Sequence, residues 1–305
     1  MTRRSFGIAL VGLLVMGLVG LYGVGWELSR PVPARIGPAP VELEAEAITF
    51  RSESGSTSRG WLSRGTTHGD VVLLLPGVRA NRLVMVDRAL VLHAAGYSTL
   101  LIDFQATGES PGDAITFGWR ERLDVIAAVQ TLRRMLPGEP IGIIGTSLGG
   151  AATLLAAPAL DVQAVVLEAV YPSIEVAVEN RLRMRFGTLG ATLSPLLIVQ
   201  LRPRLGVSPS DLKPIDRIGR LRCPIFIIGG IVDQHTTVAD TQRLYAAARE
   251  PKELWLIPDA AHVDYLRTSG AEYQRRVLAF FDRALRTRQP ANPPLQPPSS
   301  AGTTN

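Results

Sequence analysis

The sequence has little cysteine, lysine and histidine, and each shortage excludes a kind of site. A single cysteine, Cys223, allows neither an internal disulfide nor a cysteine-based metal site, and we expect it to pack as a small buried apolar residue. Lysine occurs only at Lys213 and Lys252, so arginine supplies almost all of the positive charge behind the net charge of +5. The arginines are interspersed with acids and do not cluster as a nucleic-acid-binding face requires. No nucleic-acid partner is therefore expected.

A long apolar run opens the chain. Residues 6–26 carry no charge, and at about 1.5 Å of rise per residue they would form a helix of about 31 Å, which matches the hydrocarbon core of a bilayer. The apolar core of a cleaved signal peptide is shorter, at about 7–15 residues. We therefore predict a single-pass membrane anchor over residues 1–28 and keep the signal peptide as the alternative. Arg3 and Arg4 favour a cytoplasmic amino end, so the rest of the chain is expected on the extracytoplasmic side. Two arginines beyond the run weaken this charge bias.

Proline-rich segments follow the anchor and end the chain. Four prolines between residues 29 and 44 exclude a helix there, because proline lacks the amide donor and restricts the residue before it, and we predict a connector that acts as a stalk. Residues 289–305 combine proline with small polar residues and show no periodicity. Such a composition cannot bury enough surface to order itself, so we predict a disordered tail.

Between these ends, short apolar runs rich in β-branched residues alternate with segments of helical period. This alternation indicates an α/β fold, in which a mostly parallel sheet carries helices on both faces. Two more strands, 45–50 and 60–64, flank a Ser/Gly-rich turn and are predicted to form a hairpin at the sheet edge, which gives eight strands in one domain over residues 45–288. The six other strands are predicted at residues 71–75, 98–103, 141–145, 164–168, 225–229 and 253–257, and the helices at 81–95, 118–136, 148–157, 237–249 and 270–286.

The connection between residues 168 and 225 is too long for a simple crossover, which needs about a dozen residues. We predict that residues 172–215 form a small helical cap. Within it, the alternating arginines at 181, 183 and 185 and the pair at 202 and 204 are predicted to lie on solvated helix faces.

One strand-to-helix junction has the residues of a nucleophile elbow. Ser147 lies between Gly145 and Gly149, after a buried strand and before a run of helix formers. A Gly-x-Ser-x-Gly match is weak by itself, but this context provides the sharp turn that exposes a serine hydroxyl at the carboxyl edge of the sheet. We predict that Ser147 is a catalytic nucleophile.

A serine hydroxyl needs a base to take its proton, and the chain has only four histidines. His262 is best placed, because it lies in a short loop between the last strand and the last helix. His235 is a weaker rival. His93, within a helix, and His68, at the opposite edge of the sheet, are expected to be structural.

The third member of such a site is a carboxylate that orients the imidazole. Asp233 follows the strand at 225–229 by four residues, and the order Ser147, Asp233, His262 is the order that the elbow-type fold uses. Asp259 is the alternative acid, although its position three residues before His262 better suits a loop role.

Two backbone amides must also point at the developing oxyanion. The amide of Leu148, directly after the nucleophile, supplies one. The loop after the strand at 71–75 should supply the other, and we assign it to Val78, because the preceding Gly77 permits a close approach of the backbone.

With these residues located, residues 45–286 resemble the α/β-hydrolase superfamily, and within it the membrane-anchored Bem46-like and serine-aminopeptidase-like (S33-type) hydrolases. Two departures stand out: Pro76 replaces a histidine found in many members, and Gln105-Ala106 replaces their arginine-glycine. The segments that carry the resemblance are Leu73-Leu74-Leu75-Pro76-Gly77, Ala95-Gly96-Tyr97, Leu101-Ile102-Asp103, Gly108-Glu109-Ser110 and Gly145 to Gly150.

The resemblance implies hydrolysis of an ester, thioester or amide through an acyl-serine, with no metal or organic cofactor. The substrate is expected to be a small or lipid-like acyl compound, because the cap mixes apolar runs with arginines. Two alternatives stay open: an acyltransferase that uses the same residues, and a non-catalytic membrane-anchored binding module.

Overall fold

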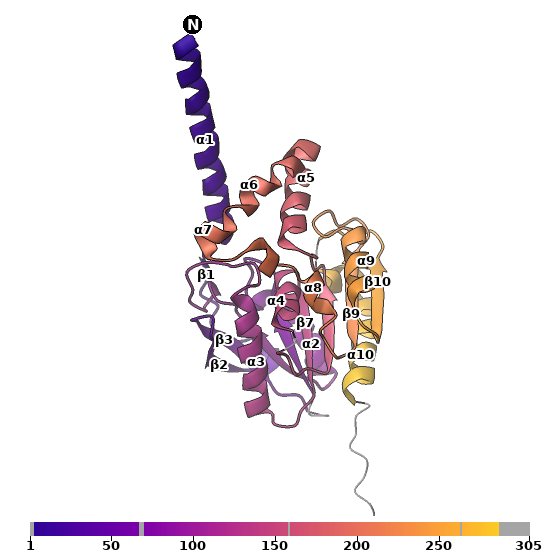
Figure 1. The fold of residues 1–305 in the computed structure, drawn as a ribbon. Helices are drawn as coiled ribbons and strands as arrows, with labels where there is room; N and C mark the ends of the chain where they lie inside the picture. Colours follow the sequence, from indigo (N-terminus) through magenta and orange to yellow (C-terminus); the bar gives the residue numbers. More distant parts are fainter. Residues whose placement is uncertain (1–2, 67–69, 158, 263, 287–305) are drawn as a thin grey trace, which may run out of the picture.

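The computed structural model describes residues 3–66, 70–157, 159–262 and 264–286. Its centre is an eight-stranded sheet in the order β10-β9-β8-β7-β4-β5-β3-β2 (Figure 1). The strand β3 runs antiparallel to both of its neighbours, and every other pair in the sheet is parallel. The strands are β2 Glu46–Arg51, β3 Thr57–Ser63, β4 Val71–Leu75, β5 Ser98–Ile102, β7 Ile141–Thr146, β8 Ala164–Glu168, β9 Ile225–Gly230 and β10 Lys252–Ile257. The predicted fold and its edge hairpin are confirmed.

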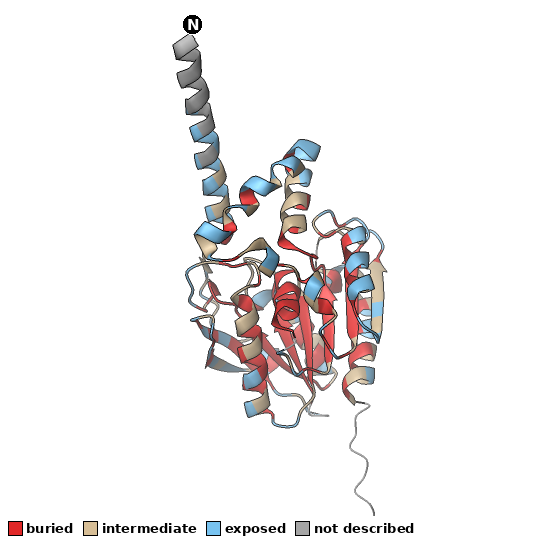
Figure 2. Ribbon diagram, viewed as in Figure 1, coloured by how far each residue is buried: buried red, intermediate tan, exposed pale blue. Residues whose placement is uncertain are grey.

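Helices cover both faces of this sheet because its parallel strands are apolar on both sides. In β4, Val71, Leu73 and Leu75 pack into one hydrophobic cluster, while Val72 and Leu74 pack into another. The first cluster includes α3 (Glu121–Met135), α4 (Leu148–Ala156), α8 (Ile215–Ile218) and α9 (Val238–Ala247), and the second includes α2 (Val86–Ala94) and α10 (Tyr265–Phe281). Figure 2 shows the resulting buried centre of the molecule.

Local hydrogen bonds set helix boundaries that the periodicity placed imperfectly. The helix predicted from residue 270 begins at Tyr265, because the Asp264 side chain accepts the amides of Leu266 and Arg267 as a cap. It continues into η4 (Asp282–Arg286). The helix predicted from residue 118 begins at Glu121, whose carboxylate accepts the amides of the preceding turn. The helix predicted from residue 81 opens as a 3-10 turn, η2 (Arg82–Met85), before α2.

The long connection between β8 and β9 is helical. It contains α5 (Ile174–Thr192), which is kinked at Gly187, then α6 (Ser194–Ile198), α7 (Leu201–Leu205), η3 (Pro209–Asp211) and α8. Figure 1 shows α5, α6 and α7 rising above the sheet on the same side as the amino-terminal helix α1 (Arg3–Ser29). We call residues 172–215 the cap.

The predicted stalk is wrong, because the connector is bound to the domain and does not stand free. Val32–Pro33 (β1) pairs in parallel with Thr107–Gly108 (β6), and Leu43, in the short helix η1 (Val41–Leu43), is fully buried. The carboxylate of Glu109 accepts the amides of Ile36 and Gly37. The connector is therefore packed along the protein surface, and it forms a short 3-10 turn at Val41–Leu43 where the sequence predicted no helix.

In the part of the chain that the structure describes, no single helix meets the length and hydropathy expected of a membrane span. The segments Ile174–Thr192 and Ser194–Leu205, bent by 98° to one another, meet the criterion as a pair. The predicted disordered tail, residues 289–305, lies outside the described residues.

Candidate active site

Three of the predicted site residues follow strands that end at the same edge of the sheet. Ser147 follows β7, Asp233 follows β9 and His262 follows β10, and these strands are parallel. Since parallel strands place their carboxyl ends together, the three loops meet at one edge, where open α/β sheets bind their ligands.

The backbone at Ser147 makes the sharp turn that an elbow requires. Its φ of 50° and ψ of −108° lie outside the regions that residues with side chains favour. A Cβ at Gly145 would lie 2.6 Å from the Gly150 nitrogen, and a Cβ at Gly149 would lie 2.4 Å from the Leu75 carbonyl oxygen. Both contacts are with backbone, so each position requires glycine.

Asp233 and His262 are in direct contact. The Asp233 Oδ2 lies 2.9 Å from the His262 Nδ1, and its Oδ1 accepts the amides of His235 at 2.7 Å and Thr236 at 3.0 Å. A buried carboxylate only accepts, so Nδ1 donates the shared proton. In a neutral imidazole this tautomer leaves Nε2 as an acceptor, which is what a general base requires.

The structure separates the predicted residues from their alternatives. The His235 ring lies 4.8 Å from the His262 ring, and burial, followed by the nearby Arg181 and His262 charges, lowers the pKa of His235. Asp259 sits in an exposed turn with a φ of 57°. His93 contacts the Ser63 hydroxyl at 2.9 Å. His68 lies outside the described residues.

The loop predicted to complete an oxyanion hole lies against the elbow. The Cβ position of Gly77 is 3.7 Å from the Ser147 Cβ, and Val78 packs on the cluster that contains Leu148. The structure describes no hydrogen bond from the Val78 or Leu148 amide to another of its described residues. The oxyanion role of these two amides stays a prediction.

Of the two departures from the resemblance, Gln105 has a clear structural role. It is buried, and its Nε2 donates to the Ala114 carbonyl at 2.6 Å and to the Glu121 carboxylate at 2.7 Å. Gln105 therefore holds the loop after β5 by hydrogen bonds within the domain.

A buried ionic network behind the elbow is absent from the sequence prediction. The Glu168 carboxylate, at the end of β8, accepts from Arg88, from the Tyr273 hydroxyl and from the Thr146 hydroxyl, while its backbone oxygen accepts the Ser147 amide at 2.8 Å. Arg88 also pairs with Asp264 at 2.9 Å. The sequence contains one signal for this network: Glu168 ends an otherwise apolar strand. A carboxylate buried there needs partners.

A mostly apolar cavity of about 170 Å³ lies between the elbow and the cap. Leu148 and Val78 form part of its wall on the sheet side, and Ile174, Val178 and Leu201 line it from the cap. Gly25 and Leu28 of α1 contribute to the same wall. Ser147 is itself buried, and its neighbour Leu148 lines the cavity, so the cavity lies next to the elbow.

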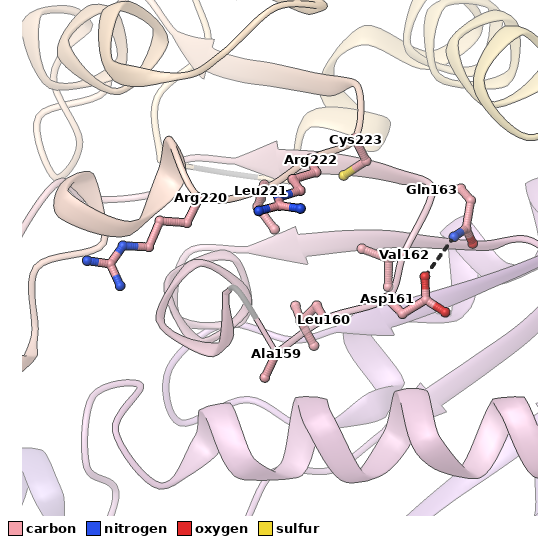
Figure 3. A pocket seen from close by; sticks show the side chains of 9 residues that line it. All are labelled: Ala159, Leu160, Asp161, Val162, Gln163, Arg220, Leu221, Arg222 and Cys223. Atoms are coloured by element: carbon pink, nitrogen blue, oxygen red, sulfur yellow. Dashed lines mark hydrogen bonds between the residues drawn. The ribbon is translucent and has the colours of Figure 1, made fainter.

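A larger, more open hollow of about 480 Å³ lies at the opposite edge of the sheet, in the loops before β8 and β9 (Figure 3). Its wall includes Cys223, which is buried as predicted, and burial raises the pKa of that thiol to about 12. A thiol with that pKa is a poor nucleophile at neutral pH. None of the predicted site residues lines this hollow.

A parallel sheet with a serine elbow, a carboxylate-bound histidine and a helical cap defines the class of α/β hydrolases. The model of the alpha/beta hydrolase family matches residues 72–275, and the chain belongs to that family.

Individual relatives cover most of the chain at low identity. It is 27% identical over 270 residues to the uncharacterized protein Rv2307c of Mycobacterium tuberculosis, which covers 84% of this chain and 87% of that protein. It is 23% identical over 245 residues to the uncharacterized protein YqkD of Bacillus subtilis, covering 79% of this chain and 80% of that one. Among solved structures, the esterase Pf2001 of Pyrococcus furiosus has a TM-score of 0.70 at 24% identity, covering 84% of this chain and 98% of the esterase, and shares the fold.

We predict that Glu168→Gln destabilises the fold by about 3 kcal/mol, because it leaves the buried Arg88 guanidinium with Asp264 as its remaining carboxylate. Glu272→Gln is the matched control. Its carboxylate pairs with Arg275 and Arg276 at the surface, where water screens both ion pairs, so its loss should leave the free energy of unfolding close to the native value. Denaturant unfolding of the full chain in detergent measures both, and equal destabilisation would contradict the role given to Glu168.

Proposed function

We propose that the chain is a serine hydrolase that cleaves esters of apolar acyl groups through an acyl-serine intermediate, in the manner of a carboxylesterase or lipase. The observation that carries the proposal is the 2.9 Å hydrogen bond between Asp233 and His262, at the sheet edge where the Ser147 elbow ends β7. Family membership and the esterase named among the solved neighbours support hydrolysis as the reaction class.

In this reaction the Ser147 hydroxyl oxygen attacks the acyl carbonyl while His262 takes its proton. Asp233 stabilises the imidazolium that forms, and the amides of Val78 and Leu148 bind the oxyanion. His262 then protonates the departing alkoxide as the bond between the acyl carbon and that oxygen breaks. Water, deprotonated by His262, attacks the acyl carbon, and the bond from that carbon to the Ser147 oxygen breaks while His262 returns the proton to Ser147, which releases the acid. Each step uses side chains and amides of this chain and requires no cofactor.

An acyltransferase is the second candidate, and one relative favours it. The chain is 30% identical over 188 residues to a protein named polyketide transferase ATR5, of Stachybotrys chlorohalonatus, covering 58% of this chain and 59% of that protein. A transferase would use the same acyl-serine but deliver the acyl group to an alcohol or amine. Product analysis with an added alcohol distinguishes the two: free acid alone indicates a hydrolase, and a new ester indicates a transferase.

We also propose that residues 1–28 anchor the protein in a membrane, with the catalytic domain on the extracytoplasmic side. Helix α1 covers the uncharged run, and the cap rises beside it (Figure 1). The cap carries large apolar side chains that face solvent, including Phe186, Leu189 and Val199, which are 64%, 72% and 67% exposed. Exposed apolar side chains in such number suit a lipid surface. A reporter that is active only in the cytoplasm, fused at the carboxyl terminus, tests this orientation. Activity of that reporter would overturn it.

Ser147→Ala should abolish covalent labelling by a fluorophosphonate probe, because the probe requires an activated serine oxygen. Ser210→Ala, at an exposed residue of η3 in the cap, should label like the native protein. In-gel fluorescence of membranes that contain the full chain measures the labelling. Unlabelled native protein would instead favour the non-catalytic binding module.

Asp233→Asn should lower kcat/KM for a 4-nitrophenyl ester by about 10⁴-fold, because the amide favours the wrong imidazole tautomer. Asp259→Asn removes the rival carboxylate, and we expect kcat/KM within about twofold of the native value, since Asp259 lies in an exposed turn. A larger loss in Asp259→Asn than in Asp233→Asn would reverse the assignment.

Because the cavity is apolar, we predict that esters with medium-length acyl chains are better substrates than acetyl esters. Each 1.4 kcal/mol of additional binding free energy should raise kcat/KM by about tenfold. A series of 4-nitrophenyl esters of increasing acyl length, assayed for kcat/KM, measures this preference. Activity confined to short polar acyl groups would refute an acyl role for the cavity.

A further inference from the structure

The cavity beside the elbow contains positive charge that its apolar wall does not neutralise. Three arginines line it, Arg79, Arg181 and Arg204, and its described lining includes no aspartate or glutamate. An apolar wall strengthens the field of any charge at its surface, because little water screens it. The cavity is therefore electrostatically suited to a ligand that is both apolar and anionic.

Two of these arginines already have partners on α1. Arg79 donates to the Glu27 carbonyl at 2.6 Å and contacts its carboxylate at 3.4 Å. Arg204 donates to the Ser29 hydroxyl at 2.8 Å and lies over the Tyr22 ring at 5.2 Å. Both guanidinium groups therefore have a structural role: Arg79 joins the oxyanion loop to α1, and Arg204 joins the cap to α1.

Arg181 has no such partner. The one hydrogen bond found for it runs from Nη1 to the Ala177 carbonyl within the same helix, at 3.4 Å, and no described carboxylate lies within ion-pair distance. The side chain is nevertheless partly buried, and this burial lowers the pKa of Arg181. The acid that acts on it electrostatically, Asp233, is already occupied by His262 and two amides. A partly desolvated cation without a counter-ion costs free energy that a bound anion would recover.

The orientation of α5 explains why Arg181 differs from its neighbours. Ile174, Ala177, Val178 and Arg181 recur at helical spacing and all line the cavity. Arg183, two residues on, is exposed and pairs with Glu179 at 2.5 Å. The prediction of solvated helix faces is therefore wrong at Arg181, which turns inward, and also at Arg204, which lines the same cavity.

We propose that Arg181 binds a carboxylate or phosphate oxyanion carried by the substrate, so that the enzyme prefers anionic acyl esters to neutral esters of the same size. This inference rests on the proposed hydrolase activity. A guanidinium presents several donors in a fixed plane and binds such oxyanions through paired, charge-assisted hydrogen bonds. The apolar wall from the cap would hold the hydrocarbon part of the same molecule. Arg181 is thus assigned as the residue that makes the enzyme select anionic over neutral substrates.

Two matched pairs of substrates test the proposal and locate the anion. The first pair compares a mono-4-nitrophenyl ester of a medium-length dicarboxylic acid with its methyl-capped neutral form. The second pair compares a 1-acylglycerol 3-phosphate with the corresponding monoacylglycerol. The native full chain in detergent should show at least a tenfold higher kcat/KM for the anionic member of one pair. A preference in the first pair places the anion on the acyl side, and one in the second places it on the alcohol side.

Arg181→Gln should reduce that preference, the ratio of kcat/KM for the anionic and the neutral member of the pair, to about one. Arg183→Gln, the exposed neighbour, should keep the native preference. Retention of neutral-ester hydrolysis shows that Arg181→Gln is folded. If the variant does not fold, inhibition of the native protein decides: dodecyl phosphate should compete with a neutral ester at least tenfold more tightly than dodecanol does.

Three outcomes would overturn the inference: equal rates within both pairs for the native protein, a preference that survives in Arg181→Gln, or equal inhibition by dodecyl phosphate and dodecanol. In each case hydrolysis of the neutral ester would leave the proposed hydrolase activity intact. Failure of the native chain to hydrolyse any ester, together with no fluorophosphonate labelling, would instead refute the proposed function itself.

Discussion

The buried carboxylate of Glu168 connects the sheet, the elbow and both helices of one face. It accepts hydrogen bonds from Arg88 of α2, from Tyr273 of α10 and from the Thr146 hydroxyl. The backbone carbonyl of Glu168 accepts the Ser147 amide. These contacts fix the two residues at which β7 turns into α4. The strained backbone of Ser147 persists because this network and the flanking glycines leave the chain no easier path.

The cavity is assembled from three parts of the chain that are distant in sequence. The sheet contributes Val78 and Leu148, the cap contributes one face of α5, and the end of α1 closes the wall. Contacts such as that of Gln200 with the Leu21 carbonyl join the cap to α1. A substrate that reached this cavity would therefore contact the cap and the end of α1 together.

The fold was predictable because its strands are continuous apolar runs, as in Val71–Leu75, which burial on both faces demands. Helix starts were less predictable, since they depend on caps such as Asp264 that hydrophobic periodicity does not register. The connector was misjudged for a related reason. Its prolines disfavour an α-helix, but they carry no information about the surface on which the chain packs, here the loop that contains Glu109.

The sequence by itself determined the α/β architecture and predicted Ser147, Asp233 and His262 as site residues, because strands and the loops at their carboxyl ends are recognised from local patterns along the chain. Only the tertiary structure decided which partners those residues have. It put Asp233 and not Asp259 against His262, paired Arg88 with Glu168, and turned Arg181 away from the solvated face of its own run. The physical reason is that hydrogen bonds and ion pairs between distant segments depend on how helices rotate and pack, which no local pattern specifies.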